Sequence, residues 1–213
     1  GIPMLFPSGL RSGHFERVFH LRSDVVNKLL KAAETLRRRH GWILRIEDGY
    51  RSPERQSAGL NSERVFNRIL RMTREERGDA LPTLDLMVKR ISCYAATTPI
   101  EANHLSGAAV DLMVVDAQTG ADIDLGGDYP EYSIATPMDS PYLSLEAARN
   151  RLELVETLAA VDLLAYPYEF WHFSNGDADY ELIRGSDLPG RHGPVLFNQE
   201  TNTFTPITNV RQS

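Results

Sequence analysis

The stretch HLSGAAVDL, residues 104–112, constrains the fold of this chain more than any other segment. It places Asp111 inside AAVDLMVV, an apolar run typical of a buried strand. Successive side chains of a strand point to opposite faces, so Val110 and Leu112 should face away from Asp111. An isolated buried charge is very costly, and the carboxylate therefore needs a metal ion, an arginine or backbone amides as its partner. We expect the fold to bring such a partner to one face of a sheet.

His104 and a second motif, EFWH, offer that partner. Gly107 lies between His104 and Asp111 and would let the backbone fold back so that both side chains converge. Glu169 and His172 are three residues apart on a predicted strand or at its end. Two imidazole nitrogens and one carboxylate oxygen form a suitable zinc set that leaves the fourth position for water. Ordinary hydrogen bonding in the core is the alternative role for these residues.

Glu169 and Arg51 are the candidate catalytic residues around such a metal. Zinc lowers the pKa of a bound water to roughly 7, and Glu169 could take its proton as the water attacks a carbonyl. The developing oxyanion needs a further positive group, which Arg51 in DGYRS could supply. The simpler alternative for Arg51 is an ion pair with Glu47 or Asp48 on a surface turn. The single cysteine, Cys93, is expected to be a small buried hydrophobe, because no base stands beside it.

Helices and hairpins alternate without a regular βαβ order, which predicts an α+β fold with one domain over residues 1–213. Ser23 or Asp24 should cap the first helix, Gly41 should end it, and Ser144 should cap a later helix. The predicted elements are a helix at 23–41, a strand at 42–47, a helix at 53–78 that is broken near Gly59, a helix at 81–92, a hairpin at 108–125, a long loop at 126–141, a helix at 144–161, a strand at 164–174, and a loop with one short strand at 190–213.

Composition excludes several classes of protein. A net charge of −6 argues against a general nucleic-acid binder, which needs a basic face. No apolar run approaches the ~20 residues of a membrane helix, so no membrane partner is expected. The first residues do not resemble a signal peptide, and we expect a cytoplasmic location, although a trimmed leader and a periplasmic or secreted location stay open. A single cysteine excludes a disulfide within the chain.

Three motifs in this order resemble the zinc D-Ala-D-Ala peptidases, which comprise VanX-like D,D-dipeptidases and VanY-like D,D-carboxypeptidases. The family pattern is Y-R, then H-x-x-G-x-A-x-D, then E-x-W-H. The likeness extends from about Leu21 to about Asp177, roughly three quarters of the chain. The pattern is matched at Tyr50, Arg51, His104, Gly107, Ala109, Asp111, Glu169, Trp171 and His172.

The resemblance implies one zinc ion per chain, held by His104, Asp111 and His172. It implies that Glu169 is the general base and acid, and that Arg51 stabilises the tetrahedral intermediate. It also implies a central antiparallel sheet flanked by helices, and a small peptide with D-amino acids as the substrate. Zinc-dependent hydrolysis of D-Ala-D-Ala or a similar dipeptide is therefore the predicted function.

The branch of the family is less sharply indicated. TPMD, which ends at Asp139, is similar to a dipeptidase element in which an acid binds the free amine of the dipeptide, and Asp128 in GGDYP is a rival for that role. GYRS looks more like the carboxypeptidase branch. Family members often have serine two residues before the histidine, where this chain has Ala102. Tyr50 is a candidate substrate contact, although packing is the simpler role for it.

Two further hypotheses stay open. The chain could be a D,D-carboxypeptidase that trims peptidoglycan stem peptides, which would accept a peptide without a free amine. It could also keep the fold and the zinc and act as a catalytically silent domain that binds cell-wall peptides. The presence of both Glu169 and Arg51 argues against that second hypothesis, because a binding domain has no evident need for either.

Overall fold

The computed structural model describes residues 3–7, 11–12, 15–16, 19–60, 62–94, 103–130 and 132–208. The prediction about Ala102 and the last part of the predicted C-terminal loop lie outside these residues. In chain order the elements are β1 (Arg11–Ser12), β2 (Phe15–Glu16), α1 (Ser23–His40), β3 (Trp42–Asp48), α2 (Pro53–Leu60), α3 (Glu63–Glu76), α4 (Leu84–Tyr94), the 3-10 helix η2 (Asn103–Ser106), β4 (Ala109–Asp116), α5 (Leu145–Ala159), β5 (Leu164–Ala165), β6 (His172–Ser174), α6 (Ala178–Ile183), β7 (Val195–Asn198) and β8 (Thr203–Pro206).

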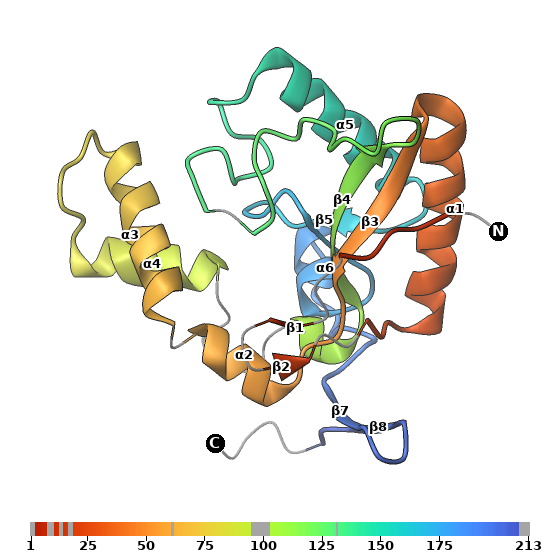
Figure 1. Ribbon diagram of the computed structural model, residues 1–213. Coiled ribbons are helices and arrows are strands. Elements are labelled where there is room, and N and C mark those ends of the chain that lie inside the picture. The colour runs from red at the N-terminus through yellow and green to blue at the C-terminus, as the bar shows by residue number, and fades with distance from the viewer. Residues whose placement is uncertain are drawn as a thin grey trace.

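The centre of the fold is a four-stranded antiparallel sheet in the order β3-β4-β6-β5 (Figure 1). β4 is a central strand and pairs with β3 on one side and β6 on the other. Two short hairpins, β1-β2 and β7-β8, form separate two-stranded sheets. The predicted α+β class with an antiparallel sheet is therefore confirmed.

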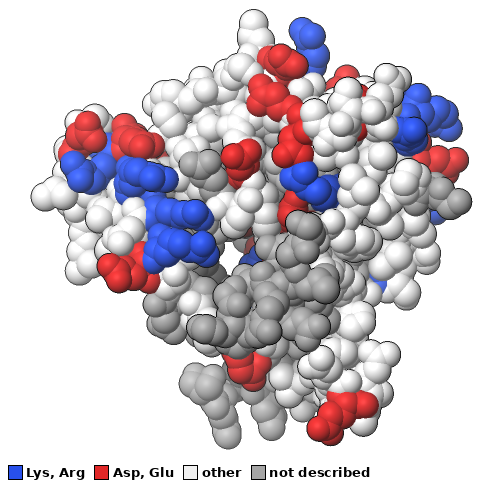
Figure 2. Space-filling view, viewed as in Figure 1, with Lys and Arg blue, Asp and Glu red and all other residues white. Residues whose placement is uncertain are grey.

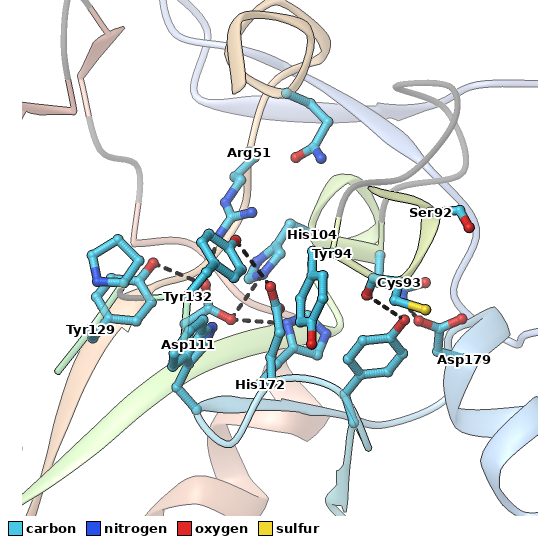
Figure 3. Close-up of a pocket in the computed structure, with 16 residues that line it drawn as sticks. Arg51, Ser92, Cys93, Tyr94, His104, Asp111, Tyr129, Tyr132, His172 and Asp179 are labelled. Carbon is cyan, nitrogen blue, oxygen red and sulfur yellow. Dashed lines mark hydrogen bonds and ion pairs between the residues drawn. The ribbon is translucent and has the colours of Figure 1, made fainter. Parts of the chain in front are cut away.

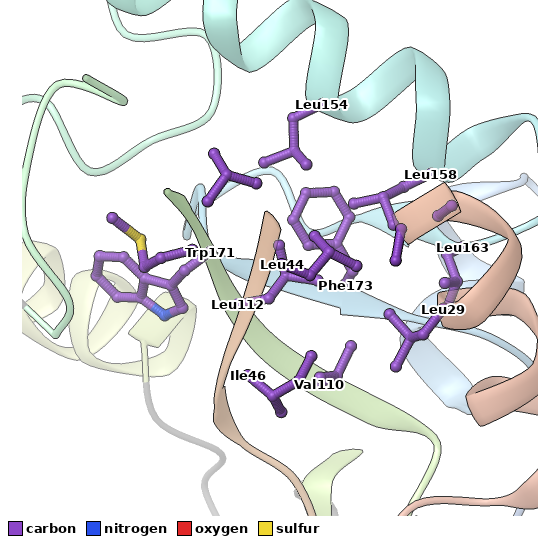
Figure 4. Close-up of a cluster of buried hydrophobic side chains, with 14 of the residues drawn as sticks. Leu29, Leu44, Ile46, Val110, Leu112, Leu154, Leu158, Leu163, Trp171 and Phe173 are labelled. Atoms are coloured by element: carbon purple, nitrogen blue, oxygen red, sulfur yellow. The ribbon is translucent and has the colours of Figure 1, made fainter. Parts of the chain in front are cut away.

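One face of the sheet is buried against α1 and α5. Val110 and Leu112 of β4 are fully buried there, together with Leu29 of α1 and Leu154 of α5 (Figure 4). The alternation of a strand sends the side chain between them, Asp111, to the other face. Truncating one such core leucine to alanine typically costs about 2–5 kcal/mol of unfolding free energy. The core thus fixes which face of β4 presents its carboxylate.

The pair α3 and α4 has a small core of its own, made by Ile69, Met72, Met87 and Tyr94. In Figure 1 this pair lies on the opposite side of the sheet from α1. Basic side chains gather over this part of the molecule in Figure 2. Arg90 of α4 forms an ion pair of 2.5 Å with Glu76 of α3. Tyr132, from the long loop before α5, packs against both this cluster and the main core.

Several predicted details differ from the structure. The N-cap of α1 is Arg22, and neither Ser23 nor Asp24 caps the helix through its side chain. The physical reason lies in Asp24, whose carboxylate accepts hydrogen bonds from Arg191 and His192 instead. The other predicted caps are confirmed: Gly41 ends α1 with a φ of 71°, and Ser144 accepts a hydrogen bond from the backbone N–H of Ala147 at the start of α5.

Two predicted strands are shorter than expected. The second strand of the predicted hairpin at 108–125 is reduced to an isolated bridge between Val115 and Asp122, although its turn forms and the backbone N–H groups of Asp116 and Ile123 donate to the carbonyls of Ala121 and Val114. The predicted strand at 164–174 is split into β5 and β6, so Glu169 lies in the connection between them. The predicted break in the helix at 53–78 is confirmed, because α2 ends at Leu60 and α3 starts at Glu63.

Within the described residues, no helix combines the length and apolar character that a membrane span requires. The cytoplasmic location and the single domain over residues 1–213 stay predictions.

Candidate active site

A row of polar residues crosses the sheet on the face away from α1. In the strand register, Asp111 of β4 is paired with Asp48 of β3 on one side and with His172 of β6 on the other. Directly paired residues point to the same face of a sheet, about 4.5–5.5 Å apart at Cβ. The row explains why an acid interrupts the apolar sequence of β4.

His104 approaches this row from η2, the 3-10 helix that precedes β4. Gly107 follows η2 with a φ of 70°, a conformation that favours glycine, and its carbonyl accepts a hydrogen bond from the backbone N–H of Arg22. The Nε of Arg22 donates to the carbonyl of Ser106, which holds the same turn. The predicted turn at Gly107 therefore brings His104 back over Asp111.

The three predicted metal ligands converge in the structure (Figure 3). Oδ1 of Asp111 lies 3.1 Å from Nε2 of His104 and 2.9 Å from Nδ1 of His172. One potential ligand atom from each residue lies within 4.8 Å of the others, and all three residues are buried. Within the described part of the chain this is the group of His, Cys, Asp and Glu side chains that could hold a metal ion.

The tautomer of His104 suits metal binding. Its Nδ1 lies 2.7 Å from the carbonyl oxygen of Gly49, which can only accept, so we assign the ring hydrogen to Nδ1. The lone pair of Nε2 then faces Asp111. Burial, followed by the charge of Arg51, lowers the pKa of His104, which favours the neutral imidazole that a metal requires.

Arg51 is tied to the same carboxylates. Its Nε donates to Oδ2 of Asp48 at 2.8 Å, and its Nη2 donates to Oδ2 of Asp111 at 2.5 Å. Asp48 also pairs with Arg55, at 2.5 Å. Burial alone would raise the pKa of Asp111, but His104 and Arg51 outweigh it and hold that pKa well below its ordinary value. Arg51 therefore pairs with Asp48, as one alternative proposed, but the pair lies beside the predicted metal ligands and not on a surface turn.

Two tyrosines from the loop before α5 orient the carboxylates. The hydroxyl of Tyr129 donates to Oδ2 of Asp111 at 2.9 Å, and that of Tyr132 donates to Oε1 of Glu169 at 3.1 Å. Both rings pack edge-on against Trp171, at centroid distances of 5.5 and 5.7 Å. Burial raises the pKa of Glu169 to about 7, which is suitable for a group that takes and returns a proton near neutral pH.

These residues share one cavity of about 290 Å³. Its wall contains the three predicted metal ligands together with Arg51 and Glu169. Such a volume lies at the lower end of the range of small-molecule sites, about 300–1,000 Å³. The structure thus brings together five of the seven site residues predicted from the sequence.

The two predicted substrate contacts lie elsewhere. Asp139 is exposed and does not line the cavity, and the same holds for its rival Asp128. Tyr50 is 2% exposed, and its hydroxyl donates to the backbone carbonyl of Val195 in the C-terminal hairpin. Cys93 does line the cavity, but burial raises the pKa of its thiol, which disfavours the nucleophilic thiolate.

Asp48, Tyr129 and Tyr132 were not predicted from the sequence as functional residues. Asp48 stands in the same DGYRS motif as Arg51, and a partly buried arginine needs such a carboxylate. The two tyrosines are three residues apart in a loop rich in Gly, Pro and Asp, where no periodicity indicates their direction. The length of that loop was the available signal, because long loops inside compact domains are often functional.

Comparison with known proteins identifies relatives of this chain. The family described as D-ala-D-ala dipeptidase matches residues 16–183. A D-alanyl-D-alanine dipeptidase of Synechocystis sp. is 32% identical over 85 residues, which are 35% of this chain and 34% of that protein. The chain thus spans about a third of the length of that curated relative.

A solved structure is also similar. It is a mutant of the vancomycin-resistance D,D-pentapeptidase VanY from a VanB-type resistance cassette, in complex with Zn(II). The match covers 88% of this chain and 95% of that chain, with 12% sequence identity and a TM-score of 0.43. The match of residues 16–183, well over half of the sequence, shows that this chain belongs to the D-Ala-D-Ala dipeptidase family of peptidases.

Proposed function

We propose that this protein is a zinc-dependent D,D-dipeptidase that hydrolyses D-Ala-D-Ala or a similar dipeptide and binds one zinc ion per chain. The observation that carries the proposal is the convergence of the ligand atoms of His104, Asp111 and His172 within 4.8 Å of one another. Glu169 and Arg51 line the same cavity and supply a proton carrier and a cation. Membership in the D-Ala-D-Ala dipeptidase family supports the substrate class.

The donor set fits zinc. Nε2 of His104, Oδ1 of Asp111 and Nδ1 of His172 would hold the ion, and two nitrogens with one oxygen are ligands that zinc accepts in catalytic sites. The other oxygen of Asp111 is held by Arg51 and Tyr129, and Nδ1 of His104 is held by Gly49. Such outer hydrogen bonds orient metal ligands. When bound, zinc acts as a Lewis acid that polarises a carbonyl and makes water acidic enough to lose a proton near pH 7.

Glu169 moves the proton in this proposal. Its pKa of about 7 means that a large fraction of the carboxyl is deprotonated at neutral pH. The carboxylate takes a proton from the attacking water and then gives it to the amine that leaves when the C–N bond breaks. Tyr132 keeps one carboxyl oxygen, Oε1, in place, so Oε2 is the oxygen available for this transfer.

Arg51 stabilises the negative charge that develops on the carbonyl oxygen. Its Nε and Nη2 are engaged by Asp48 and Asp111, while its Nη1 makes no hydrogen bond with a described residue. The two ion pairs hold the guanidinium rigidly, and a donor fixed in advance costs no reorganisation during the reaction. Nη1 is therefore the candidate donor to the oxyanion.

The test is amine release from free D-Ala-D-Ala and from N-acetyl-D-Ala-D-Ala by the zinc-loaded protein, beside a Glu169→Ala variant. Cleavage of the free dipeptide alone, with an inactive variant, supports the dipeptidase. Equal cleavage of both peptides would replace it by the D,D-carboxypeptidase. Zinc binding without cleavage of any D-amino-acid peptide would favour the silent cell-wall-binding domain.

A further inference from the structure

The cavity extends beyond the predicted metal ligands toward α4 and α6. Asn103, Asp179 and the end of α4, with Ser92 and Cys93, form this part of its wall. We call His104, Asp111 and His172 the His104 cluster. In Figure 3, Tyr129 lies on one side of this cluster and Asp179 lies on the other, next to Cys93 and Ser92. The catalytic groups proposed above leave this end of the cavity without a role.

Asp179 is the unassigned carboxylate of the cavity. The described acids that line it are Asp111, Glu169 and Asp179, and the first two have roles as a metal ligand and a proton carrier. Oδ2 of Asp179 accepts a hydrogen bond from Nδ2 of Asn103, while Oδ1 accepts none from a described residue. No described Lys, Arg or His forms an ion pair with it. A half-buried carboxylate in a cavity, with an oxygen that no described residue engages, is a suitable partner for a cation.

The position of this carboxylate relative to the metal ligands is fixed. Asn103 directly precedes His104 in the same turn of 3-10 helix. Asp179 belongs to α6, whose N-cap Asp177 accepts hydrogen bonds from Ser174 of β6 and from the backbone N–H of Tyr180. The hydrogen bond between Asn103 and Asp179 therefore connects η2, which carries the proposed ligand His104, to α6. This helix is anchored on β6, the strand that carries the proposed ligand His172.

We propose that Asp179, held by Asn103, binds an ammonium group of the substrate while the scissile bond lies at the His104 cluster. This inference rests on the proposed function and names the residue that selects the substrate. Because the Asp179 carboxylate is held at a fixed separation from the His104 cluster, the site favours peptides in which the distance between the cation and the scissile bond matches that separation. Two sources supply that cation: the α-amine of a free dipeptide, or the side-chain amine of a basic residue that precedes D-Ala-D-Ala in a longer peptide.

The test compares Asp179→Asn with the matched control Asp139→Asn, which alters the exposed acid predicted from the sequence. The substrates are D-Ala-D-Ala, N-acetyl-D-Ala-D-Ala, and Nα-acetyl-L-Lys-D-Ala-D-Ala with and without acetylation of its Nε. Both kcat/KM and the dissociation constant are measured, the latter by calorimetry on the inactive Glu169→Gln protein with and without each substitution. Loss of a charged hydrogen bond should weaken binding of the recognised ammonium peptide by about tenfold to 100-fold.

The expected result is that Asp179→Asn removes the preference for one amine-bearing peptide over its acetylated partner, while Asp139→Asn keeps that preference. The peptide affected identifies the source of the ammonium. The proposal is overturned if Asp179→Asn leaves both preferences unchanged, if Asp139→Asn removes them, or if no amine-bearing peptide binds better than its acetylated form. Binding that depends on Asp179 without any cleavage would instead contradict the proposed function and leave the anchor standing.

Discussion

The hydroxyl of Tyr132 donates a hydrogen bond to Oε1 of Glu169, with 3.1 Å between the two oxygens. Burial raises the pKa of Glu169, and the hydrogen bond opposes that rise because it favours the charged carboxylate. Contacts with Tyr94 and Trp171 hold the ring of Tyr132 edge-on, so packing sets the direction of the hydroxyl. Tyr132 thus connects the small α3–α4 core to the proposed proton carrier.

Tyr132→Phe should lower kcat for D-Ala-D-Ala about tenfold with little change in KM, because a hydrogen bond to a charged group contributes about 1.5–3 kcal/mol. It should also move the acidic limb of the pH profile of kcat to higher pH, since the carboxylate loses a stabilising donor. The measurement is steady-state kinetics from about pH 5 to about pH 9. Tyr142→Phe, at a tyrosine that is 60% exposed, is the control. An unmoved limb would show that the hydrogen bond does not tune Glu169.

Glu169 should also make stability depend on pH. Its pKa is raised from 4.5 to about 7 in the folded protein, so the folded state binds more protons than the unfolded state between these values. Its contribution to the free energy of unfolding is therefore fully present below about pH 4.5 and falls as pH rises to about 7. Each pH unit in this window corresponds to at most 1.36 kcal/mol. Because Glu169 is partly open to the cavity, we expect a loss on the order of 2 kcal/mol.

Glu169→Gln removes this dependence. In metal-free protein the variant should match the wild type near pH 4.5 and exceed its free energy of unfolding by on the order of 2 kcal/mol near pH 8. Urea unfolding of both proteins across this range gives the difference curve, which also contains the change in the pKa of His172 that the charge of Glu169 raises. A flat difference curve would rule out a raised pKa for Glu169.

Removing and restoring zinc tests whether Asp111 is a ligand of the metal. Zinc at 1,000 times its dissociation constant should raise the free energy of unfolding of the wild type by about 4 kcal/mol. Asp111→Asn should abolish that gain, and it should cost about 3 kcal/mol even with a chelator present, because Arg51 and His172 lose their shared carboxylate. Thermal unfolding with zinc and with chelator measures both effects, and Asp128→Asn is the exposed control. A zinc-dependent gain in Asp111→Asn as large as in the wild type would place the metal elsewhere.

Local sequence signals predicted which segments form helices and strands better than they predicted which strands pair with one another. The helix α1 is visible from its apolar stripe and from Gly41, which a left-handed C-cap favours. The hairpin at 108–125 forms only as a turn with one antiparallel bridge, and the main partners of β4 are β3 and β6, about 60 residues away on either side, which no local signal indicates. Periodicity reports which face of a strand is apolar and carries no information on which strand lies beside it.

The candidate site shows the same difference between residues that belong to local motifs and residues whose role depends on how distant elements pack. The convergence of His104, Asp111 and His172 could be expected because their motifs place metal-ligand types in an apolar setting and resemble the pattern of the zinc D-Ala-D-Ala peptidases. Asp179 could not, since its role depends on α6 packing beside the cavity, and an acid in SNGDADYE is typical of a surface loop. The structure places Asp139 outside the cavity for a similar reason, because the long loop before α5 contributes its tyrosines and not this acid.

Tyr50 separates a structural role from a substrate contact. Its hydroxyl donates to the carbonyl of Val195 and accepts from the backbone N–H of Phe197, both at 3.1 Å, and its ring packs edge-on against Phe204. Tyr50→Phe should therefore lower the free energy of unfolding by about 1–2 kcal/mol, because two backbone groups of β7 lose their partner. The KM for D-Ala-D-Ala should stay the same, since Tyr50 does not line the cavity. Urea unfolding and steady-state kinetics measure the two effects, with Tyr142→Phe as the control. A raised KM with unchanged stability would restore the substrate contact predicted from the sequence.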